Sequence, residues 1–169
     1  MKKTECDRTE FVRGDKLALS LCWKDEHVAA VQIHWADEVE PSADPTPRAV
    51  ELRAALARYE ARQDPQWPDL PFDMARLTAF QQAALDELRR IPSGTTRTYG
   101  DMAARLDRPG GAQAVGRAMA TNPFPLLYPC HRVVGANGAM TGFSGSGGVD
   151  MKEYLLRLEG AIQDELPLG

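Results

Sequence analysis

The sequence contains no long hydrophobic run. Within its 169 residues, no apolar stretch approaches the roughly 20 residues that a membrane-spanning helix needs. Residues 1–5 also lack the apolar core of a secretion signal, so we expect a cytoplasmic protein with no membrane partner. With 43% hydrophobic residues the chain can still bury a core, either as one ordinary domain or as two small ones.

Cysteine is scarce, and the count of three is odd. Three cysteines are too few for the disulfide framework of a small secreted domain. The count is typical of a reducing compartment, in which a free thiol stays reactive. We therefore expect the three cysteines to act separately.

The chain has no basic excess, because its formal net charge is −4. Taken alone, this charge argues against a nucleic-acid binder, since such domains usually carry a basic footprint. The charge is uneven, however: residues 1–70 hold 14 acidic and 10 basic side chains, whereas residues 71–169 hold 10 of each. Within residues 88–117, six arginines against two aspartates form a modest candidate phosphate-facing patch. Ordinary solvated helix faces are the other interpretation.

The first third of the chain alternates apolar and polar residues. The alternation over residues 17–21 and 28–33 predicts two or three short antiparallel strands with a turn near residues 24–26. Residues 49–62 then place apolar side chains on one helical face. Residues 63–73, with three prolines and three aspartates, predict a linker.

The later part of the chain predicts three helices. The first begins near Thr78 as its cap and ends at the Ile-Pro-Ser-Gly sequence of residues 91–94. Two more, over residues 100–106 and 112–121, flank a turn at residues 107–111, which is typical of a helix-turn-helix. The small residues of the last helix suit either close approach to a DNA groove or tight helix packing.

These patterns together predict an α+β fold in two domains. Residues 1–72 form a small sheet-plus-helix domain with its linker. Residues 73–169 form a mainly helical domain with a winged-helix-like helix-turn-helix.

A thiol beside an imidazole is the most informative feature that the chain does contain. Residues 129–133 read Pro-Cys-His-Arg-Val, so Cys130 and His131 are neighbours. Thiolate, not thiol, attacks electrophiles, and a neighbouring imidazole that takes the proton makes Cys130 a candidate nucleophile. Without further context, a small buried cysteine beside a strand histidine is the other interpretation.

Further motifs surround this pair. They are Phe80-Gln81-Gln82, Ile91-Pro92-Ser93-Gly94, Thr98-Tyr99-Gly100, Ala114-Val115-Gly116-Arg117-Ala118, Asn122-Pro123, Thr141-Gly142-Phe143-Ser144-Gly145 and Leu158-Glu159-Gly160. In order and spacing, this set resembles the active-site half of the O6-alkylguanine-DNA alkyltransferases, also called methylated-DNA–protein-cysteine methyltransferases. The resemblance covers roughly residues 78 to 161, and the first 70 residues match only in general layout.

The resemblance implies a single, irreversible transfer of an alkyl group from O6 of guanine to Cys130. Displacement at the alkyl carbon leaves a thioether, which has no easy hydrolytic exit, so each molecule is consumed. His131 is implied as the base, acting through a water, and Glu159 as the carboxylate that orients and balances it. Asn122 is implied as the hinge between the last predicted helix and the Cys130 segment. An isolated Glu159 would otherwise be interpreted as a surface carboxylate at a helix end.

The target atom lies inside a duplex, so the resemblance implies a base flipped into a pocket. The carbonyls of Cys130 and Val133 would accept from the exocyclic amine, and the backbone N–H of Ser144 would donate to O6. Phe143 and Gly145 belong to the same pocket loop. The resemblance also implies that Tyr99 crowds the phosphate that has to swing.

The implied partner is double-stranded DNA carrying O6-alkylguanine, bound by a monomer without a cofactor. The residues implied for this interface are Tyr99, Ala112, Gln113, Gly116 and Arg117. Gln113 stands where the family commonly has an arginine that fills the gap in the stack. We expect weaker DNA affinity or slower flipping, partly rescued if Arg117 leans toward the groove.

The pocket loop departs from the family as well. Phe143 stands where many relatives have tyrosine, and residues 146–148 make the loop two residues longer than the common form. The longer loop predicts a pocket open to bulkier alkyl groups.

An N-terminal set of Cys6, Cys22 and His27 is similar to one that holds structural zinc in some relatives. Those relatives add a later histidine, whereas this chain has none between His34 and His131. We expect no metal. Zinc with His34 as the fourth ligand is the alternative that stays open.

Three other functions remain as alternatives. The first is a lesion-recognition protein that flips alkylated bases without accepting the alkyl group; such proteins replace the nucleophile, so Cys130 argues against it. The second is a metal- or redox-responsive helix-turn-helix regulator, which needs a dimer and a palindromic site. The third is a Cys-His hydrolase, which requires turnover.

Overall fold

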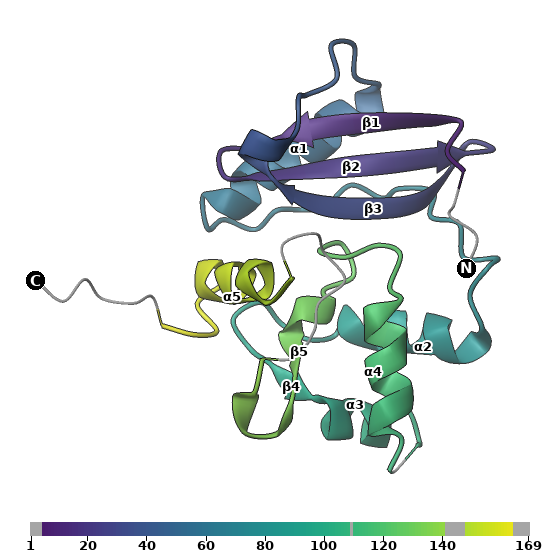
Figure 1. The fold of residues 1–169 in the computed structure, drawn as a ribbon, viewed down its shortest axis with the longest axis vertical. Helices are drawn as coiled ribbons and strands as arrows, with labels where there is room; N and C mark the ends of the chain where they lie inside the picture. Colours follow the sequence, from purple (N-terminus) through teal and green to yellow (C-terminus); the bar gives the residue numbers. More distant parts are fainter. Residues whose placement is uncertain (1–4, 109, 141–147, 164–169) are drawn as a thin grey trace, which may run out of the picture. The chain divides into compact units, whose positions relative to one another are not determined.

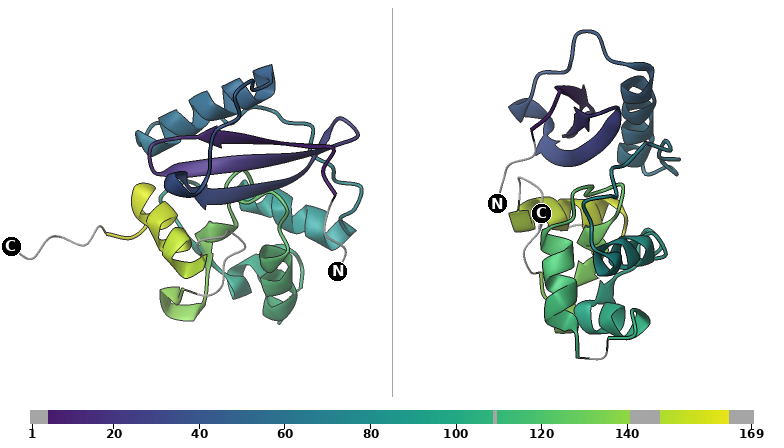
Figure 2. Two further views of the ribbon diagram at one scale, coloured as in Figure 1. Left: turned by 45° about the horizontal axis from the view of Figure 1, so that its top comes forward. Right: turned by 90° about the vertical axis from the view of Figure 1, so that its right-hand side faces the viewer.

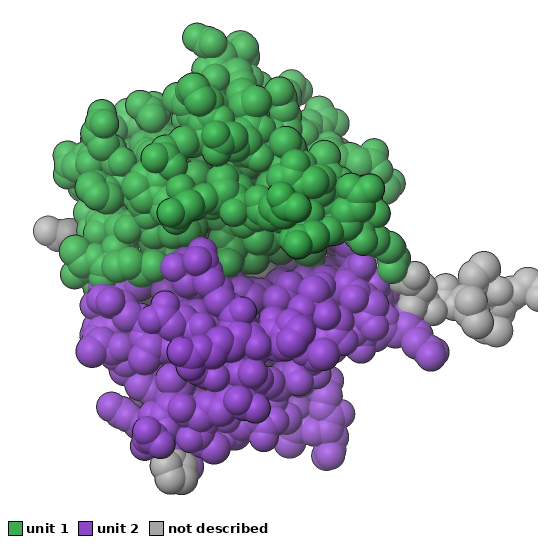
Figure 3. All heavy atoms as spheres, turned by 180° about the vertical axis from the view of Figure 1, so that it is seen from behind, with its two compact units in different colours: residues 1–76, 123–127, 145–147 green, residues 77–122, 128–144, 148–169 purple. Residues whose placement is uncertain are grey.

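The computed structural model describes residues 5–108, 110–140 and 148–163 and divides the chain into two compact units (Figure 3). Among the described residues, unit 1 contains the chain up to Arg76 together with residues 123–127. Unit 2 contains residues 77–122, 128–140 and 148–163. An antiparallel sheet with separate helices confirms the expected α+β class (Figure 1).

Unit 1 is a three-stranded antiparallel sheet with one long helix. The strands β1 (Arg8–Arg13), β2 (Leu17–Lys24) and β3 (His27–Trp35) follow one another in sequence order. Helix α1 (Pro47–Glu60) lies across one face of the sheet (Figure 2). A short 3₁₀ turn, η1 (Ala36–Glu38), follows β3.

The predicted alternation places the core of unit 1. Leu19 and Leu21 of β2 stand opposite Ile33 and Val31 of β3, and all four are buried. Side chains two residues apart on a strand share a face, so these four form one apolar surface. The predicted turn is also confirmed, because residues 25–26 connect β2 to β3 with positive φ angles.

A short segment from the second half of the sequence, residues 123–127, completes unit 1. The carbonyl of Pro123 accepts a hydrogen bond from the N–H of Val31 at 2.8 Å. Phe124 is fully buried, with its ring centroid 4.6 Å from that of Phe72. The chain therefore contributes residues 123–127 to unit 1 between two stretches of unit 2.

Unit 2 contains the three predicted helices: α2 (Ala79–Leu88), α3 (Tyr99–Arg105) and α4 (Ala112–Ala120). Thr78 caps α2 as expected, in a reciprocal capping box with Gln81. A second capping box, Thr98 with Asp101, begins α3. Helices α3 and α4 pack against each other across the predicted turn, as in a helix-turn-helix.

Three short elements of unit 2 carry the Cys130 segment. Two 3₁₀ turns, η2 (Cys130–Arg132) and η3 (Ala136–Gly138), flank strand β5 (Val133–Val134). Strand β4 (Arg97–Thr98) pairs with β5 in parallel. The pairing places the start of α3 beside the residues that follow Cys130.

Helix α5 (Gly148–Leu158) closes unit 2. Its buried positions, 151, 152, 155 and 156, recur at three- and four-residue spacing, so one stripe faces the core. No helix within the described ranges is both long and apolar enough to cross a membrane.

Candidate active site

The thiol of Cys130 lies at the start of η2. The residue is 4% exposed and is the one free cysteine among the described residues. Its backbone N–H donates to the carbonyl of Tyr128 at 2.8 Å. Its own carbonyl accepts from the N–H of Val133, which ends the 3₁₀ turn. Backbone hydrogen bonds on both sides thus hold the sulfur-bearing residue in place.

His131 and Glu159 form a buried hydrogen-bonded pair. Nε2 of His131 lies 2.6 Å from Oε2 of Glu159, and the two side chains are 0% and 1% exposed. Glu159 directly follows the last residue of α5, so the helix delivers the carboxylate to the imidazole. The structure therefore brings together the two residues that the resemblance paired.

The environment keeps Glu159 ionised. Burial alone would raise its pKa, because a low-dielectric site disfavours the charged form. The charge and hydrogen bond of His131, with those of Arg132, outweigh burial and lower the pKa to about 2. An ionised carboxylate therefore faces Nε2 of His131, so Nδ1 is the ring nitrogen that Glu159 does not contact.

Sequence reasoning missed Lys152. The residue is 1% exposed, and its Nζ donates to the carbonyl of Val133 at 2.7 Å and lies 6.0 Å from the ring centroid of Tyr99. Burial lowers its pKa, while a charge on Cys130 acts in the opposite direction. The sequence did contain a signal for Lys152, which falls on the apolar stripe of α5, seven residues before Glu159. A lysine on a core-facing stripe needs a buried partner.

The two carbonyls assigned to the base's exocyclic amine already accept hydrogen bonds. Cys130 O accepts from the Val133 N–H, and Val133 O accepts from Lys152 Nζ. A carbonyl oxygen has two lone pairs, so each keeps a second acceptor position.

Tyr99 and Asn122 both lie near the Cys130 segment. Tyr99 is half-buried at the first position of α3, directly after the strand that pairs with β5. Asn122 is 5% exposed, and its Nδ2 donates to the carbonyl of Tyr128 at 3.0 Å. This hydrogen bond joins the two residues that flank the unit 1 segment 123–127, and the second of them lies two positions before Cys130.

Helix α4 presents the residues assigned to DNA on its accessible side. Ala112, Gln113 and Arg117 are exposed, whereas Val115 is buried. A Cβ added at Gly116 would meet no atom within 4 Å. Tight packing among the described residues is therefore not the reason why position 116 lacks a side chain.

The arginine patch is only partly available to a phosphate. Glu87, which is buried, contacts Arg90 at 2.8 Å, Arg97 at 3.1 Å and Arg105 at 4.0 Å. The charges of the patch were counted over residues 88–117, so the count did not include Glu87. Glu87 lowers the formal excess from +4 over residues 88–117 to +3 over residues 87–117, so most of the local positive charge remains.

The pocket-loop residues Phe143, Ser144 and Gly145, and the longer loop itself over residues 146 and 147, lie outside the described residues.

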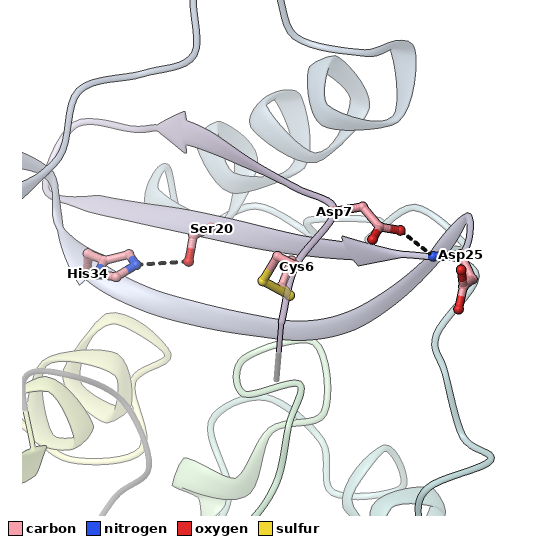
Figure 4. The surroundings of a disulfide bond; sticks show 6 residues. Cys6, Asp7, Ser20, Asp25 and His34 are labelled. Atoms are coloured by element: carbon pink, nitrogen blue, oxygen red, sulfur yellow. Dashed lines mark hydrogen bonds between the residues drawn. A yellow bond between two sulfur atoms is a disulfide. The ribbon is translucent and has the colours of Figure 1, made fainter. Parts of the chain in front are cut away.

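The N-terminal cysteines are joined. Cys6 and Cys22 form a disulfide with Cα atoms 5.3 Å apart (Figure 4). The expectation that they act separately is wrong, because a bend at Asp7, just before β1 begins opposite Trp23, brings Cys6 next to Cys22 on β2. Composition alone does not reveal that register.

The zinc alternative loses two ligands in this arrangement. Sulfurs bonded to each other are not thiolates, which zinc requires. His27 donates through Nδ1 to the carbonyl of Asp25 at 2.9 Å, and His34 hydrogen-bonds Ser20 at 3.0 Å (Figure 4). Over residues 5–108, 110–140 and 148–163, no three histidine, cysteine or acidic side chains gather into a metal-binding group.

Comparisons with known proteins agree on one family. A family model for "6-O-methylguanine DNA methyltransferase, DNA binding domain" matches residues 79–161. A methylated-DNA–protein-cysteine methyltransferase of Methanosarcina acetivorans is 48% identical over 84 residues, which is 50% of this chain and 53% of that protein. The chain thus spans about half the length of that curated relative. The constitutive methylated-DNA–protein-cysteine methyltransferase of Bacillus subtilis is 37% identical over 128 residues, covering 75% of this chain and 76% of that one.

A solved structure extends the similarity to both units. The crystal structure of Mycobacterium tuberculosis OGT in complex with DNA superposes with a TM-score of 0.71 at 32% identity. The superposition covers 90% of this chain and 92% of that one.

Proposed function

The chain belongs to the methylated-DNA–protein-cysteine methyltransferase family, and we propose that it repairs DNA by direct reversal, moving an alkyl group from O6 of guanine to Cys130. The observation that carries this proposal is the buried His131–Glu159 pair, whose histidine directly follows Cys130, the one free thiol of the described residues. A thiol, a base and a carboxylate that orients the base are the groups that nucleophilic catalysis needs.

The transfer is a displacement at carbon. The proton of Cys130 passes to His131, through a water as the resemblance implies, and Glu159 balances the imidazolium that forms. The sulfur lone pair forms the new S–C bond as the C–O6 bond breaks, and its electron pair leaves with the purine, which is then protonated. The product is a thioether, so one chain accepts one alkyl group.

A buried lysine favours the same step. A thiolate at Cys130 stabilises the protonated form of Lys152, whose charge burial would otherwise disfavour. The reverse also holds, because an ammonium nearby stabilises the thiolate.

DNA binding is assigned to α4. Ala112 and Gly116 are small and let the backbone approach a groove closely, while the exposed Gln113 and Arg117 can reach the DNA with their side chains. The damaged base then leaves the stack, with Tyr99 at the phosphate, and enters the pocket that the resemblance assigns to Val133, Phe143, Ser144 and Gly145. Asn122 fixes the turn before the thiol. Uncharged Gln113 makes flipping slow.

We also propose that the protein acts as a monomer in the cytoplasm, with neither metal nor cofactor, and that residues 73–169 hold all of the reacting groups. A stoichiometric transfer needs one thiol, and that thiol supplies the chemistry without an added group.

Intact-mass measurement tests the proposed function. The protein is incubated with duplex DNA containing one O6-methylguanine and then weighed. We expect a gain of one methyl group per chain, located on Cys130 by peptide mapping, and no further gain with excess DNA. Cys130→Ser serves as the control and should stay unmodified.

The alternatives give other outcomes. Binding without any mass gain supports lesion recognition without transfer, repeated turnover supports a hydrolase, and binding only to a palindrome supports a regulator. Each of these results would overturn the proposal.

The open space at Gly116 makes a separate prediction. Gly116→Leu should leave the folded chain intact or slightly stabilise it, because leucine is a better helix former by roughly 0.5–1 kcal/mol and its Cβ meets no atom within 4 Å. We expect it to weaken duplex binding by about tenfold or more, because the side chain stands where a groove wall would approach. Thermal unfolding and a DNA titration measure the two effects, and unchanged affinity would refute the assignment of α4.

A further inference from the structure

Glu159 contacts two side chains, one through each carboxylate oxygen. Oε2 faces Nε2 of His131 at 2.6 Å, and Oε1 accepts from Nε of Arg132 at 2.7 Å. The Arg132 side chain is 14% exposed and that of Glu159 is 1% exposed, so this ion pair is largely shielded from solvent. A carboxylate held on both oxygens cannot rotate without losing a charge-assisted hydrogen bond.

Arg132 is itself anchored. Its Nη1 donates to the carbonyl of Ile91 at 2.7 Å, in the turn that follows α2. This turn is part of the Ile-Pro-Ser-Gly motif of residues 91–94, to which no role has been given so far. Gly94 in the same turn has φ of +87°, and a Cβ there would lie 3.1 Å from the carbonyl oxygen of Glu159. The turn therefore supports Glu159 both through Arg132 and by close backbone approach.

The charges around Glu159 come from few elements. On η2 they are Cys130, His131 and Arg132; on α5, Lys152 interacts electrostatically with Cys130, and its Nζ lies 6.0 Å from the ring centroid of Tyr99 on α3. Residues 91–96 carry no titratable side chain. Among these groups, Arg132 is the direct partner of Glu159 that carries charge at every working pH.

We propose that Arg132 is a positioning residue for the proposed transfer: anchored on Ile91, it fixes the Glu159 carboxylate toward His131 and compensates its charge. This inference rests on the proposed function. Within that function it gives a role to Arg132, the residue that follows Cys130 and His131. With Arg132 in place, the Glu159 carboxylate stays aimed at Nε2 of His131, and the cation lowers the proton affinity of the buried groups around it.

Two substitutions separate charge from geometry. Arg132→Gln removes the cation, and removing a positive charge from a buried cluster raises the proton affinity of every remaining group. The pH profile of Cys130 alkylation by iodoacetamide should therefore shift to higher pH, by about one unit. Arg132→Lys keeps the charge but cannot donate to Glu159 and Ile91 in the same planar fork. It should leave the profile in place and slow methyl transfer from DNA by about tenfold or more.

The readout is specific, because Cys130 is the one free cysteine of the described residues. Arg48→Gln is the matched control: Arg48 is exposed on α1 of unit 1 and likewise donates to a backbone carbonyl, that of Asp69 at 2.8 Å, and its loss should leave both readouts unchanged. Circular dichroism and thermal unfolding establish that each variant is folded.

An Arg132→Gln profile that coincides with the parent's, or an Arg132→Lys variant as fast as the parent, would overturn the inference. If Arg132→Gln fails to fold, the rate of Arg132→Lys still decides the geometric half. Iodoacetamide needs no DNA, so a parent that accepts no methyl group from DNA refutes the proposed function, whereas an unshifted thiol profile refutes only the role of Arg132.

Discussion

Glu159→Gln should slow methyl transfer from O6-methylguanine by up to roughly 10⁴-fold, the loss seen when the carboxylate of a Ser-His-Asp relay becomes an amide. A neutral amide cannot balance the imidazolium that forms when His131 takes the proton of Cys130. If the amide NH₂ faces Nε2, the proton moves to Nδ1 and that nitrogen can no longer act as a base. Single-turnover transfer to a methylated duplex measures the change.

Glu153→Gln is the control on the same helix. Glu153 is 34% exposed and pairs with Arg157 one turn away, at 3.5 Å. Such surface pairs contribute little, so the control should react at the parental rate. A Glu159→Gln variant that also reacts at the parental rate would remove the carboxylate from the mechanism.

Acid should destabilise the parent protein more than the Glu159→Gln variant. The pKa of Glu159 lies at about 2 instead of its usual 4.5, so the ionised carboxylate stabilises the fold above pH 4.5. At about 1.4 kcal/mol per pKa unit, the contribution is about 3 kcal/mol, and it is lost as the pH falls from 4.5 toward 2. Urea unfolding from pH 7 to pH 2 should therefore show the parent's advantage over Glu159→Gln shrinking by about that amount.

Glu153→Gln again provides the comparison. Its unfolding free energy should run parallel to the parent's across the same pH range, because an exposed pair adds little. A constant gap between the parent and Glu159→Gln down to pH 2 would contradict the buried ion pair.

Local sequence signals predicted most elements of the fold. The alternation in β2 and β3, the cap at Thr78 and the glycine-containing turn before α4 each depend on neighbours in sequence, and the structure has all three. The Cys130–His131 pair was visible for the same reason. Its carboxylate partner, 28 residues away from His131, was found only through the resemblance.

Features that depend on contacts between residues distant in sequence could not be predicted from local patterns. Strands β4 and β5 have two residues each, too few for a periodic pattern, and their pairing joins residues 36 apart. The Cys6–Cys22 disulfide needs the register of two strands, and the role of Lys152 needs the orientation of α5. Each of these is fixed by tertiary packing and not by local propensity.

The course of residues 123–127 bears on how this protein can be divided. Phe124 is fully buried against Phe72 in unit 1, while the flanking residues Asn122 and Tyr128 belong to unit 2. A cut at the predicted boundary, between residues 72 and 73, therefore separates the Phe124 ring from that of Phe72. We expect residues 73–169, made alone, to carry an uncovered phenylalanine side chain that unit 1 buries in the full chain.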